Sequence, residues 1–468
     1  MATQSTQHPS QTVVIVGGGL SGLVCALQVR KLCPHVRLLV IERSLRRGPG
    51  LAYGEFAAGH VLNVPARRLG IGSDLSFHDW LAARVEQYDL DEALAEAGGH
   101  IEDMFAPRAA FGDFLEETAH RNSDNGVFEW IQGEAAGFLP APRRGIVLAD
   151  GSELEAAAVI LATGNESPGP IGIASLEDAP QFIANPWAGG ALDRVAKDAP
   201  VVVVGSGLTA VDVALALNRA GHVAGVTLVS RRGLLPRRHK LCPPADAFIP
   251  VSDTESPAVL IRRVRRKVAD ATAGGTLWQG VIDAIRPVTR DIWQGWNKVE
   301  QRTFLRHLRA WWDVYRHRMA PRIANHVERI LSEGYLRVVA GRITGARDVG
   351  GLLEIDVSLR GGDPTRLQAR HVINCTGPTT NVTVRSSPIV ADGLARGFVR
   401  GDALGLGIET NACAAIASDG VASDWLFAIG PLTRPEFWEV TAVPEILAQG
   451  RALAERLSAA DTTRGYGI

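Results

Sequence analysis

Cysteine is scarce in this sequence, and its positions exclude several kinds of site. The five cysteines stand at positions 25, 33, 242, 375 and 413, and no two of them form a C-x-x-C pair. A disulfide framework, a zinc site of clustered thiolates and a dithiol redox centre are therefore excluded. The histidines at 307, 317 and 326 lack the spacing of metal ligands on one helix. We expect reduced, mostly buried thiols and no metal.

Long apolar runs and an excess of one charge are also missing. No apolar run approaches the roughly 18 residues of a membrane span, and the polar start MATQSTQHPSQ has neither region of a secretory signal. A formal net charge of −1 over 468 residues gives no overall attraction to nucleic acid or anionic membrane. We expect a cytoplasmic protein that acts on a small molecule, without a nucleic-acid or membrane partner. The oligomeric state stays open.

The sequence does contain a glycine-rich turn near its start, in TVVIVGGGLSGLVCALQVRKLCPHVRLLVIER. Residues 13–16 predict a strand buried on both faces. Gly17 allows a tight turn, Gly19 lets the backbone approach a pyrophosphate, and Gly22 lets helix and strand pack closely. Glu42 follows Gly22 at the distance where a carboxylate accepts hydrogen bonds from a ribose diol. This order of strand, glycines, helix, strand and acid predicts a dinucleotide site.

A second copy of this plan begins at residue 199, in APVVVVGSGLTAVDVALALNRAGHVAGVTLVSRR. Counting from the last small residue of its GSGLTA turn, the position equivalent to Glu42 is Ser230, and two arginines follow it. A small hydroxyl and guanidinium groups can bind a 2′-phosphate, which a carboxylate would repel. The alternative is that the arginines are only solvated charges at a strand end. The expected NADPH site comprises Gly205, Gly207, Ser230, Arg231 and Arg232.

Together the two turns predict an α/β protein with two Rossmann-like dinucleotide-binding domains. The acid in the first and the arginines in the second indicate tightly bound FAD and visiting NADPH, with NADH less favoured, and hydride passing from one cofactor to the other. We expect a discontinuous FAD domain over 1–170 and 370–468, and an NADPH domain over 171–369. Within the latter, residues 250–332 predict an inserted helical subdomain.

This insert has its own composition. From 256 to 330 it holds 15 Lys or Arg against 6 Asp or Glu, and five of the ten tryptophans. Basic residues among aromatics can bind nucleic acid, but their helical spacing fits an amphipathic face packed on the α/β body. A covering lid that provides positive potential near an anionic substrate is a further possibility.

Three other segments support cofactor binding. The stretches AAAVILATGNESPGP and ARHVINCTGPTTN predict strands that end in a small hydroxyl residue and glycine, where the chain can pass close to a cofactor. The tail predicts a strand over 425–429, a turn at Gly430 and a helix opened or kinked by Pro435 or Pro444. Such a helix N-terminus suits the electron-rich pyrimidine edge of a flavin, although a plain packing helix is an equal alternative.

The segments GPGLAYGEFAAGHVLNVPARRLG (48–70), FAPRAAFGDFL (105–115) and FAIGPL (427–432) carry a resemblance over nearly the whole chain. With ATGNESPGP and FIANPW, the sequence resembles bacterial FAD/NAD(P)-binding oxidoreductases related to class B flavin monooxygenases. The resemblance implies that HVLNVP lies against the flavin. FIANPW lacks the histidine of the Baeyer–Villiger signature, which disfavours ketone insertion. The expected FAD site comprises Gly17, Gly19, Gly22, Glu42, Arg43, Asn63, Val64, Gly164 and Gly430.

The function that this resemblance implies is an NADPH-consuming monooxygenase, which uses O₂ and a flavin C4a-hydroperoxide to hydroxylate a small polar, anionic substrate. The most specific expectation is a bacterial FAD-dependent urate hydroxylase, converting urate to 5-hydroxyisourate in purine catabolism. Two alternatives stay open: a flavin reductase that passes electrons to a quinone or protein acceptor, and a non-catalytic FAD-containing redox sensor or scaffold. Candidates to hold or polarise the substrate are Arg434, His239 and Arg67.

Overall fold

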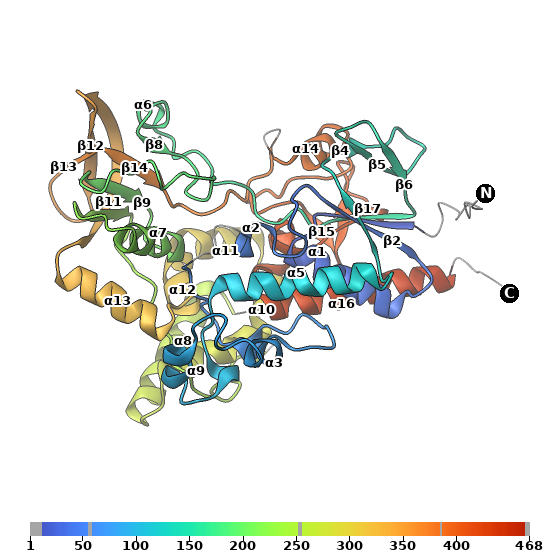
Figure 1. Ribbon diagram of the computed structural model, residues 1–468, viewed down its shortest axis with the longest axis horizontal. Helices are drawn as coiled ribbons and strands as arrows, with labels where there is room; N and C mark the ends of the chain where they lie inside the picture. The colour runs from blue at the N-terminus through green and yellow to red at the C-terminus, as the bar shows by residue number, and fades with distance from the viewer. Residues whose placement is uncertain (1–11, 55–58, 251–254, 384–385, 464–468) are drawn as a thin grey trace.

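The computed structural model describes residues 12–54, 59–250, 255–383 and 386–463. Two seven-stranded sheets form its frame, one at each end of the view in Figure 1. The first has the order β15-β16-β17-β7-β1-β2-β3 and takes strands from both ends of the chain. Its strands are β1 Thr12–Val16, β2 Arg37–Glu42, β3 Glu129–Gln132, β7 Ala158–Leu161, β15 Thr410–Asn411, β16 Ala414–Ile416 and β17 Ala422–Ala428.

Strand β1 lies in the interior of this sheet because residues 13–16 are apolar on both faces. It pairs in parallel with β2 on one side and with β7 on the other, and all five of its residues are buried. Helix α1 (Leu20–Leu32) follows directly and packs against α16 (Val443–Thr463), so the two ends of the chain share one core. Helix α5 (Arg108–Asp124) packs into the same core.

The second sheet has the order β13-β12-β11-β10-β9-β14-β8. Its central strand β9 is again parallel to both neighbours, and α7 (Leu208–Arg219) follows it as α1 follows β1. The strands are β8 Phe182–Ile183, β9 Val201–Val204, β10 Val226–Ser230, β11 Leu336–Val349, β12 Leu352–Leu359, β13 Thr365–Ala369 and β14 His371–Asn374. A small third sheet contains β4 Ala135–Phe138, β5 Gly145–Leu148 and β6 Glu153–Glu155.

Two expected boundaries require correction. Strand β14 pairs with β9, so the second sheet extends to Asn374 and does not end at residue 369. Helix α13 (Pro321–Ser332), expected in the insert, buries Ile323 and Val327 in the core of the second sheet. The apolar face of α13 and the strand β14 both pack in this core. Local sequence did not predict this, because their packing partners lie far away along the chain.

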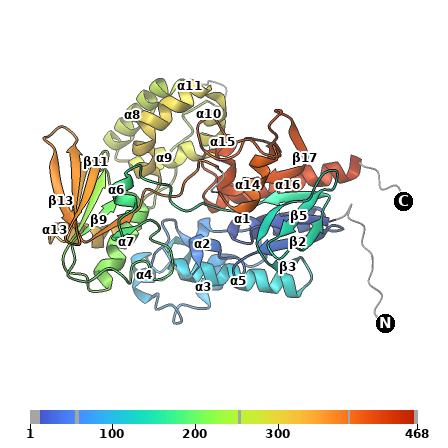
Figure 2. The same ribbon diagram turned by 90° about the horizontal axis from the view of Figure 1, so that it is seen from above.

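The inserted helices lie over the middle of the molecule, between the two sheets (Figure 2). Trp293 of the insert stacks on Trp438 with ring centroids 4.7 Å apart, which docks the insert on the segment before α16. The helices are α8 Pro257–Ala273, α9 Trp278–Ile285, η5 Arg286–Val288, α10 Thr289–Gly295, α11 Lys298–Thr303, the π-helix η6 Phe304–Leu308 and α12 Arg309–Arg316. The insert thereby becomes a wall shared by both sheet domains.

The remaining elements are short and join these parts. They are α2 Gly50–Tyr53, η3 Ala66–Arg68, α3 Phe77–Ala82, α4 Asp91–Glu96, η4 Ile101–Asp103, α6 Ala174–Glu177, α14 Pro388–Ala395, η7 Gly430–Thr433 and α15 Arg434–Phe437. Among the described helices, none combines the length and apolarity needed to cross a bilayer.

Candidate functional site

The two glycine turns are built alike. Gly17 and Gly205 have φ of +102° and +122°, which side chains rarely adopt. A Cβ added at Gly17 would overlap the carbonyl oxygen of Ala162, and one at Gly205 would overlap that of Cys375. The ATG and CTG segments that follow β7 and β14 therefore occupy equivalent places beside the two turns, as sequence analysis expected of strands next to a cofactor.

The other glycines separate into those required for packing and those that leave space. A Cβ at Gly22 would overlap the carbonyl oxygen of Gly17, so close packing requires this glycine. Gly207 has no described atom within 4 Å of its Cβ position. Gly19 and Gly207 are the N-caps of α1 and α7, and neither helix receives a side-chain cap from the described residues. The free N–H groups at the start of both helices, together with the open space at Gly207, fit the pyrophosphate of a dinucleotide.

The two turns differ at the ends of the following strands. Glu42 accepts a hydrogen bond from the Gly18 N–H at 2.8 Å, so its carboxylate lies on the first turn. In the second domain, the Ser206 hydroxyl donates to that of Ser230 at 2.7 Å. Arg231 is exposed, and Arg232 donates to the His307 carbonyl of η6 at 3.3 Å. The residues present therefore fit FAD at the first turn and a 2′-phosphorylated nucleotide at the second.

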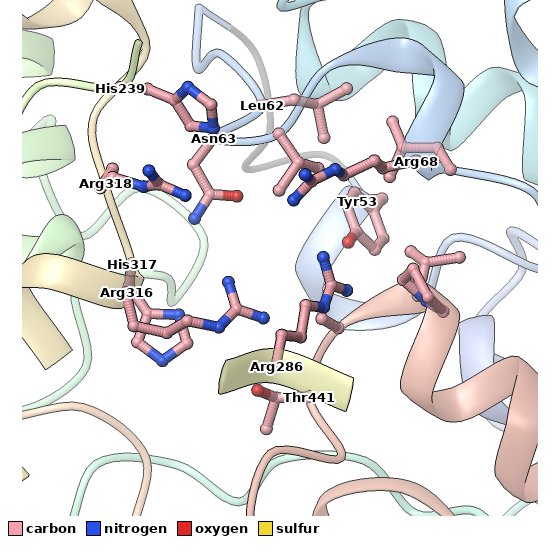
Figure 3. Close-up of a pocket in the computed structure, with 15 residues that line it drawn as sticks. Tyr53, Leu62, Asn63, Arg68, His239, Arg286, Arg316, His317, Arg318 and Thr441 are labelled. Carbon is pink, nitrogen blue, oxygen red and sulfur yellow. The ribbon is translucent and has the colours of Figure 1, made fainter. Parts of the chain in front are cut away.

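A cavity of about 90 Å³ lies where the first domain, the second domain, the insert and the start of α16 meet. Figure 3 shows its side chains pointing inward from these four sources. Asn63 and Val64, expected beside the flavin, line it together with Tyr53, Leu62 and Leu69. Arg68 lines it from η3. The opposite side comprises His239, Arg286, Arg316, His317, Arg318 and residues 441–444, which lead into the start of α16.

The lining is cationic. It contains four arginines, and none of the described lining residues is a carboxylate. The matching carboxylates lie behind the arginines: Asp283 pairs with Arg318 and lies 3.5 Å from Arg68. Glu445 accepts from Arg286 at 2.7 Å. Glu439 lies 3.2 Å from the Nε of Arg316.

Two histidines in the pocket are held neutral. Burial lowers the pKa of His239 to about 3, and the positive charge of Arg318 and Arg68 acts in the same direction. Burial also lowers the pKa of His317, although Glu439 opposes this shift. The Nδ1 atom of His239 has no hydrogen-bond partner within the described chain. A neutral imidazole there can donate or accept one hydrogen bond to a ligand.

The structure brings only one of the three predicted substrate residues to this pocket. His239 lines it, whereas Arg67 forms an ion pair with Asp103 outside the lining. Arg434 lies with its Cζ atom 5.2 Å from the ring centroid of Trp438 and is also absent from the lining. Trp438 itself is buried. Desolvation by burial lowers the pKa of Arg434.

The remaining predicted cofactor residues lie near the first turn or at its periphery. A Cβ at Gly430 would touch Ser21 in the first turn of α1, so Gly430 lies beside the expected pyrophosphate position. Gly164 has φ of +73° and open space at its Cβ position. Arg43 is largely exposed and lies 3.5 Å from Glu134.

Most of the cationic wall of the pocket was not predicted from the sequence. The missed lining residues are Arg68, Arg286, Arg316, His317 and Arg318. The excess of basic residues over 256–330 was the available signal, but it did not distinguish side chains on the pocket from those on the surface. Val314 and Met319, on either side of residues 316–318, form backbone hydrogen bonds with Arg237 and His239, a pairing that no local pattern indicates.

Comparison with known proteins agrees with this architecture. Residues 14–166 match a family model described as FAD-NAD(P)-binding. The ornithine N-hydroxylase of Kutzneria sp. 744 has a TM-score of 0.66 at 14% identity, over 97% of this chain and 100% of that chain. L-lysine 6-monooxygenase from Pseudomonas syringae gives 0.65 at 13%, over 97% and 100%. Bacillithiol disulfide reductase from Staphylococcus aureus gives 0.57 at 13%, over 96% and 99%.

No curated protein matches the sequence. Residues 14–166 nevertheless match the FAD-NAD(P)-binding family model, and the chain shares its two-sheet fold with these three structures over nearly their whole length. The expected α/β class with Rossmann-type folding is thereby confirmed.

Proposed function

We propose that this protein is an FAD-dependent, NADPH-consuming monooxygenase that acts on a small anionic substrate. The observation that carries the proposal is the arginine-lined pocket. Its wall at Leu62, Asn63 and Val64 is the segment expected against the flavin, and its other wall comes from the insert and the second domain. A substrate bound there would lie between the two dinucleotide-binding units.

The two glycine turns support the assignment of both cofactors. The first turn, with Gly17, Gly19, Gly22 and Glu42, would hold FAD, and the second turn with Arg231 and Arg232 would hold NADPH. When bound, the cofactors supply hydride transfer and oxygen activation. The reported Kutzneria structure contains reduced FAD and NADP⁺, which supports the same pair for this chain.

The chain itself supplies positioning and exclusion of water. The insert closes the pocket from one side, and four arginines stabilise negative charge inside it. The first peptide units of α16 add positive potential, because the start of this helix lines the pocket. The sequence predicted a helix directly after the Gly430 turn, whereas the structure has the short η7 and α15 there and begins the long helix α16 at Val443.

The charge of the pocket argues against substrates like those of two similar structures, the ornithine N-hydroxylase and L-lysine 6-monooxygenase. Those proteins are named for ornithine and lysine, amino acids with cationic side chains. Four arginines without a carboxylate among the described lining residues would repel such a side chain. Urate is an anion at neutral pH and satisfies the charge requirement, but so do other small anions, and the comparisons do not support urate in particular.

The test measures whether an oxygen atom from O₂ is transferred to a substrate. Purified yellow protein is incubated with NADPH and a panel of small anions that includes urate, while NADPH loss and O₂ uptake are recorded under ¹⁸O₂. The proposal expects ¹⁸O in a product formed from an anion. Failure of urate alone removes urate and leaves the class of reaction; absence of label from every substrate, with NADPH still consumed, contradicts a monooxygenase.

A second candidate is an NADPH-dependent reductase, because disulfide reductases share the fold. Four of the five cysteines are buried, and burial raises the pKa of the half-buried Cys242. These thiols are poorly suited to disulfide exchange, so a reductase would serve a quinone or a protein acceptor. NADPH loss that requires an added acceptor, with no label transfer, identifies this alternative.

A further inference from the structure

The arginines that line the pocket outnumber the carboxylates that pair with them. Arg68, Arg286, Arg316 and Arg318 line it, and three carboxylates, Asp283, Glu439 and Glu445, pair with them from behind. His239 and His317 are neutral near pH 7, because burial lowers the pKa of each. One positive charge therefore remains. A charge in a buried site is costly unless it is paired, so the site requires one negative charge from its ligand.

The hydrogen-bonding pattern places this requirement at Arg318. Arg316 also has two donor atoms without a hydrogen-bond partner in the described chain, but these lie 3.2 Å from Glu439 and 3.8 Å from Glu445, so carboxylates already offset its charge. Its side chain is 1% exposed, and Asp283 engages only the Nη2 atom. The Nε and Nη1 atoms have no hydrogen-bond partner in the described part of the chain. In Figure 3 the guanidinium group of Arg318 lies beside Asn63 at one end of the pocket, near His239. Buried donors of this kind are normally satisfied, which indicates that a ligand supplies the missing acceptor.

The rest of the lining suits the body of such a ligand. Leu62, Leu69 and Val443 provide apolar contacts in the same cavity. A ligand with a single negative charge at one end and an apolar body at the other would match both the cationic and the apolar parts of the lining. A dianion would leave an excess negative charge, and an amine would add to the positive charge already present.

We propose that this pocket selects a singly charged organic oxyanion of the monocarboxylate type, with Arg318 as the residue that binds the oxyanion and Asp283 as the residue that positions Arg318. The inference rests on the proposed function, since it names the substrate class of the same site. It assigns the substrate specificity to the ion pair of Arg318 and Asp283, which joins helix α9 to the segment between α12 and α13.

The test measures binding of defined probes to the FAD-loaded protein by calorimetry. Benzoate represents a monoanion, phthalate a dianion and benzylamine a cation of similar size. We expect benzoate to bind more tightly than phthalate, and benzylamine not to bind. Arg318→Gln should weaken benzoate at least about tenfold, the loss expected for a charge-assisted hydrogen bond. Arg265→Gln, the same change at an exposed site of the insert, should leave it unchanged.

Asp283→Asn provides a readout that a purely structural role would not give. Removal of this carboxylate raises the pocket charge by one, so phthalate binding should strengthen relative to benzoate. Retained FAD and far-ultraviolet circular dichroism establish that each variant is folded. If Arg318→Gln does not fold, Arg68→Gln, which lowers the charge to zero, should weaken benzoate instead.

Several outcomes overturn the inference. These are equal affinity for benzoate and phthalate, tight binding of benzylamine, or a folded Arg318→Gln protein with unchanged benzoate affinity. The proposed function fails separately: a protein that binds benzoate through Arg318 but never transfers ¹⁸O keeps the inference about the anion site and loses the monooxygenase. Transfer of ¹⁸O to an amine keeps the monooxygenase and loses the inference.

Discussion

Two alanine substitutions in one turn should separate a glycine required for folding from a glycine required for binding. Gly205→Ala forces a side chain into φ of +122° and into the carbonyl oxygen of Cys375. The unfavourable backbone costs about 1–2 kcal/mol, and the overlap about 1–3 kcal/mol more. Gly207→Ala meets no described atom within 4 Å. It loses only the preference for glycine over alanine at an N-cap, about 0.5–1 kcal/mol.

The binding of NADPH, in contrast to stability, should be affected more by Gly207→Ala than by Gly205→Ala. The open space at Gly207 is where the pyrophosphate would approach the N-terminus of α7, so a methyl group there should weaken hydrogen bonds from N–H groups to phosphate. Such bonds to a charged group contribute about 1.5–3 kcal/mol, which corresponds to a KM for NADPH raised about tenfold to a hundredfold.

The assay combines thermal unfolding with stopped-flow reduction of the flavin by NADPH. We expect Gly207→Ala to unfold close to the wild-type temperature but to require far more NADPH. Gly205→Ala should unfold at a clearly lower temperature. An unchanged KM for Gly207→Ala would refute the assignment of this turn to NADPH. Equal thermal losses for both variants would refute the steric reasoning.

Three further predictions concern the strand ends and the pocket. Arg231→Ala and Arg232→Ala should each raise the KM for NADPH about tenfold, the lower limit for a charge-assisted contact at an exposed site, and change NADH use little; equal losses with both nucleotides would contradict the 2′-phosphate role. Glu42→Gln should weaken FAD binding to the apoprotein about tenfold or more, measured by fluorescence titration; unchanged affinity would remove its ribose role. In the folded protein the pKa of His239 is about 3, below its ordinary value of 6.5. As the pH falls from 6.5 towards 3, only the unfolded chain therefore gains a proton at this residue. The stability that His239 contributes above pH 6.5 is lost in that window. In urea unfolding, wild type should lose about 2 kcal/mol more than His239→Gln between pH 7 and pH 5; equal losses would show that His239 is not held neutral.

The parts of the fold that local sequence encodes were predictable. Four consecutive β-branched residues before each glycine turn made β1 and β9 readable as central strands, since only a strand buried on both faces tolerates that run. The contrast between Glu42 and Ser230 was equally readable, because both positions are defined by counting from a turn. The boundary near residue 370 was not, since β14 is apolar enough for either sheet and its place depends on pairing with β9.

Arg434 shows why the substrate residues were harder to predict. Its position after a Gly-Pro turn favoured a role in holding the substrate, yet Trp438 covers its guanidinium group. Arg318 carried no distinguishing local signal, because its neighbours Arg316 and His317 are also basic. Its importance comes from burial, from Asp283 on another helix and from two donor atoms without partners in the described chain.

The sequence by itself determined that this protein has two glycine turns of the dinucleotide-binding type, and it predicted which cofactor each one favours, because glycine spacing and the residue at a strand end act over short distances along one chain. Only the tertiary structure decided the charge of the pocket. That charge is the balance between arginines and carboxylates from η3, the insert and the start of α16, and side chains so far apart in sequence meet only after both sheets and the insert have packed together.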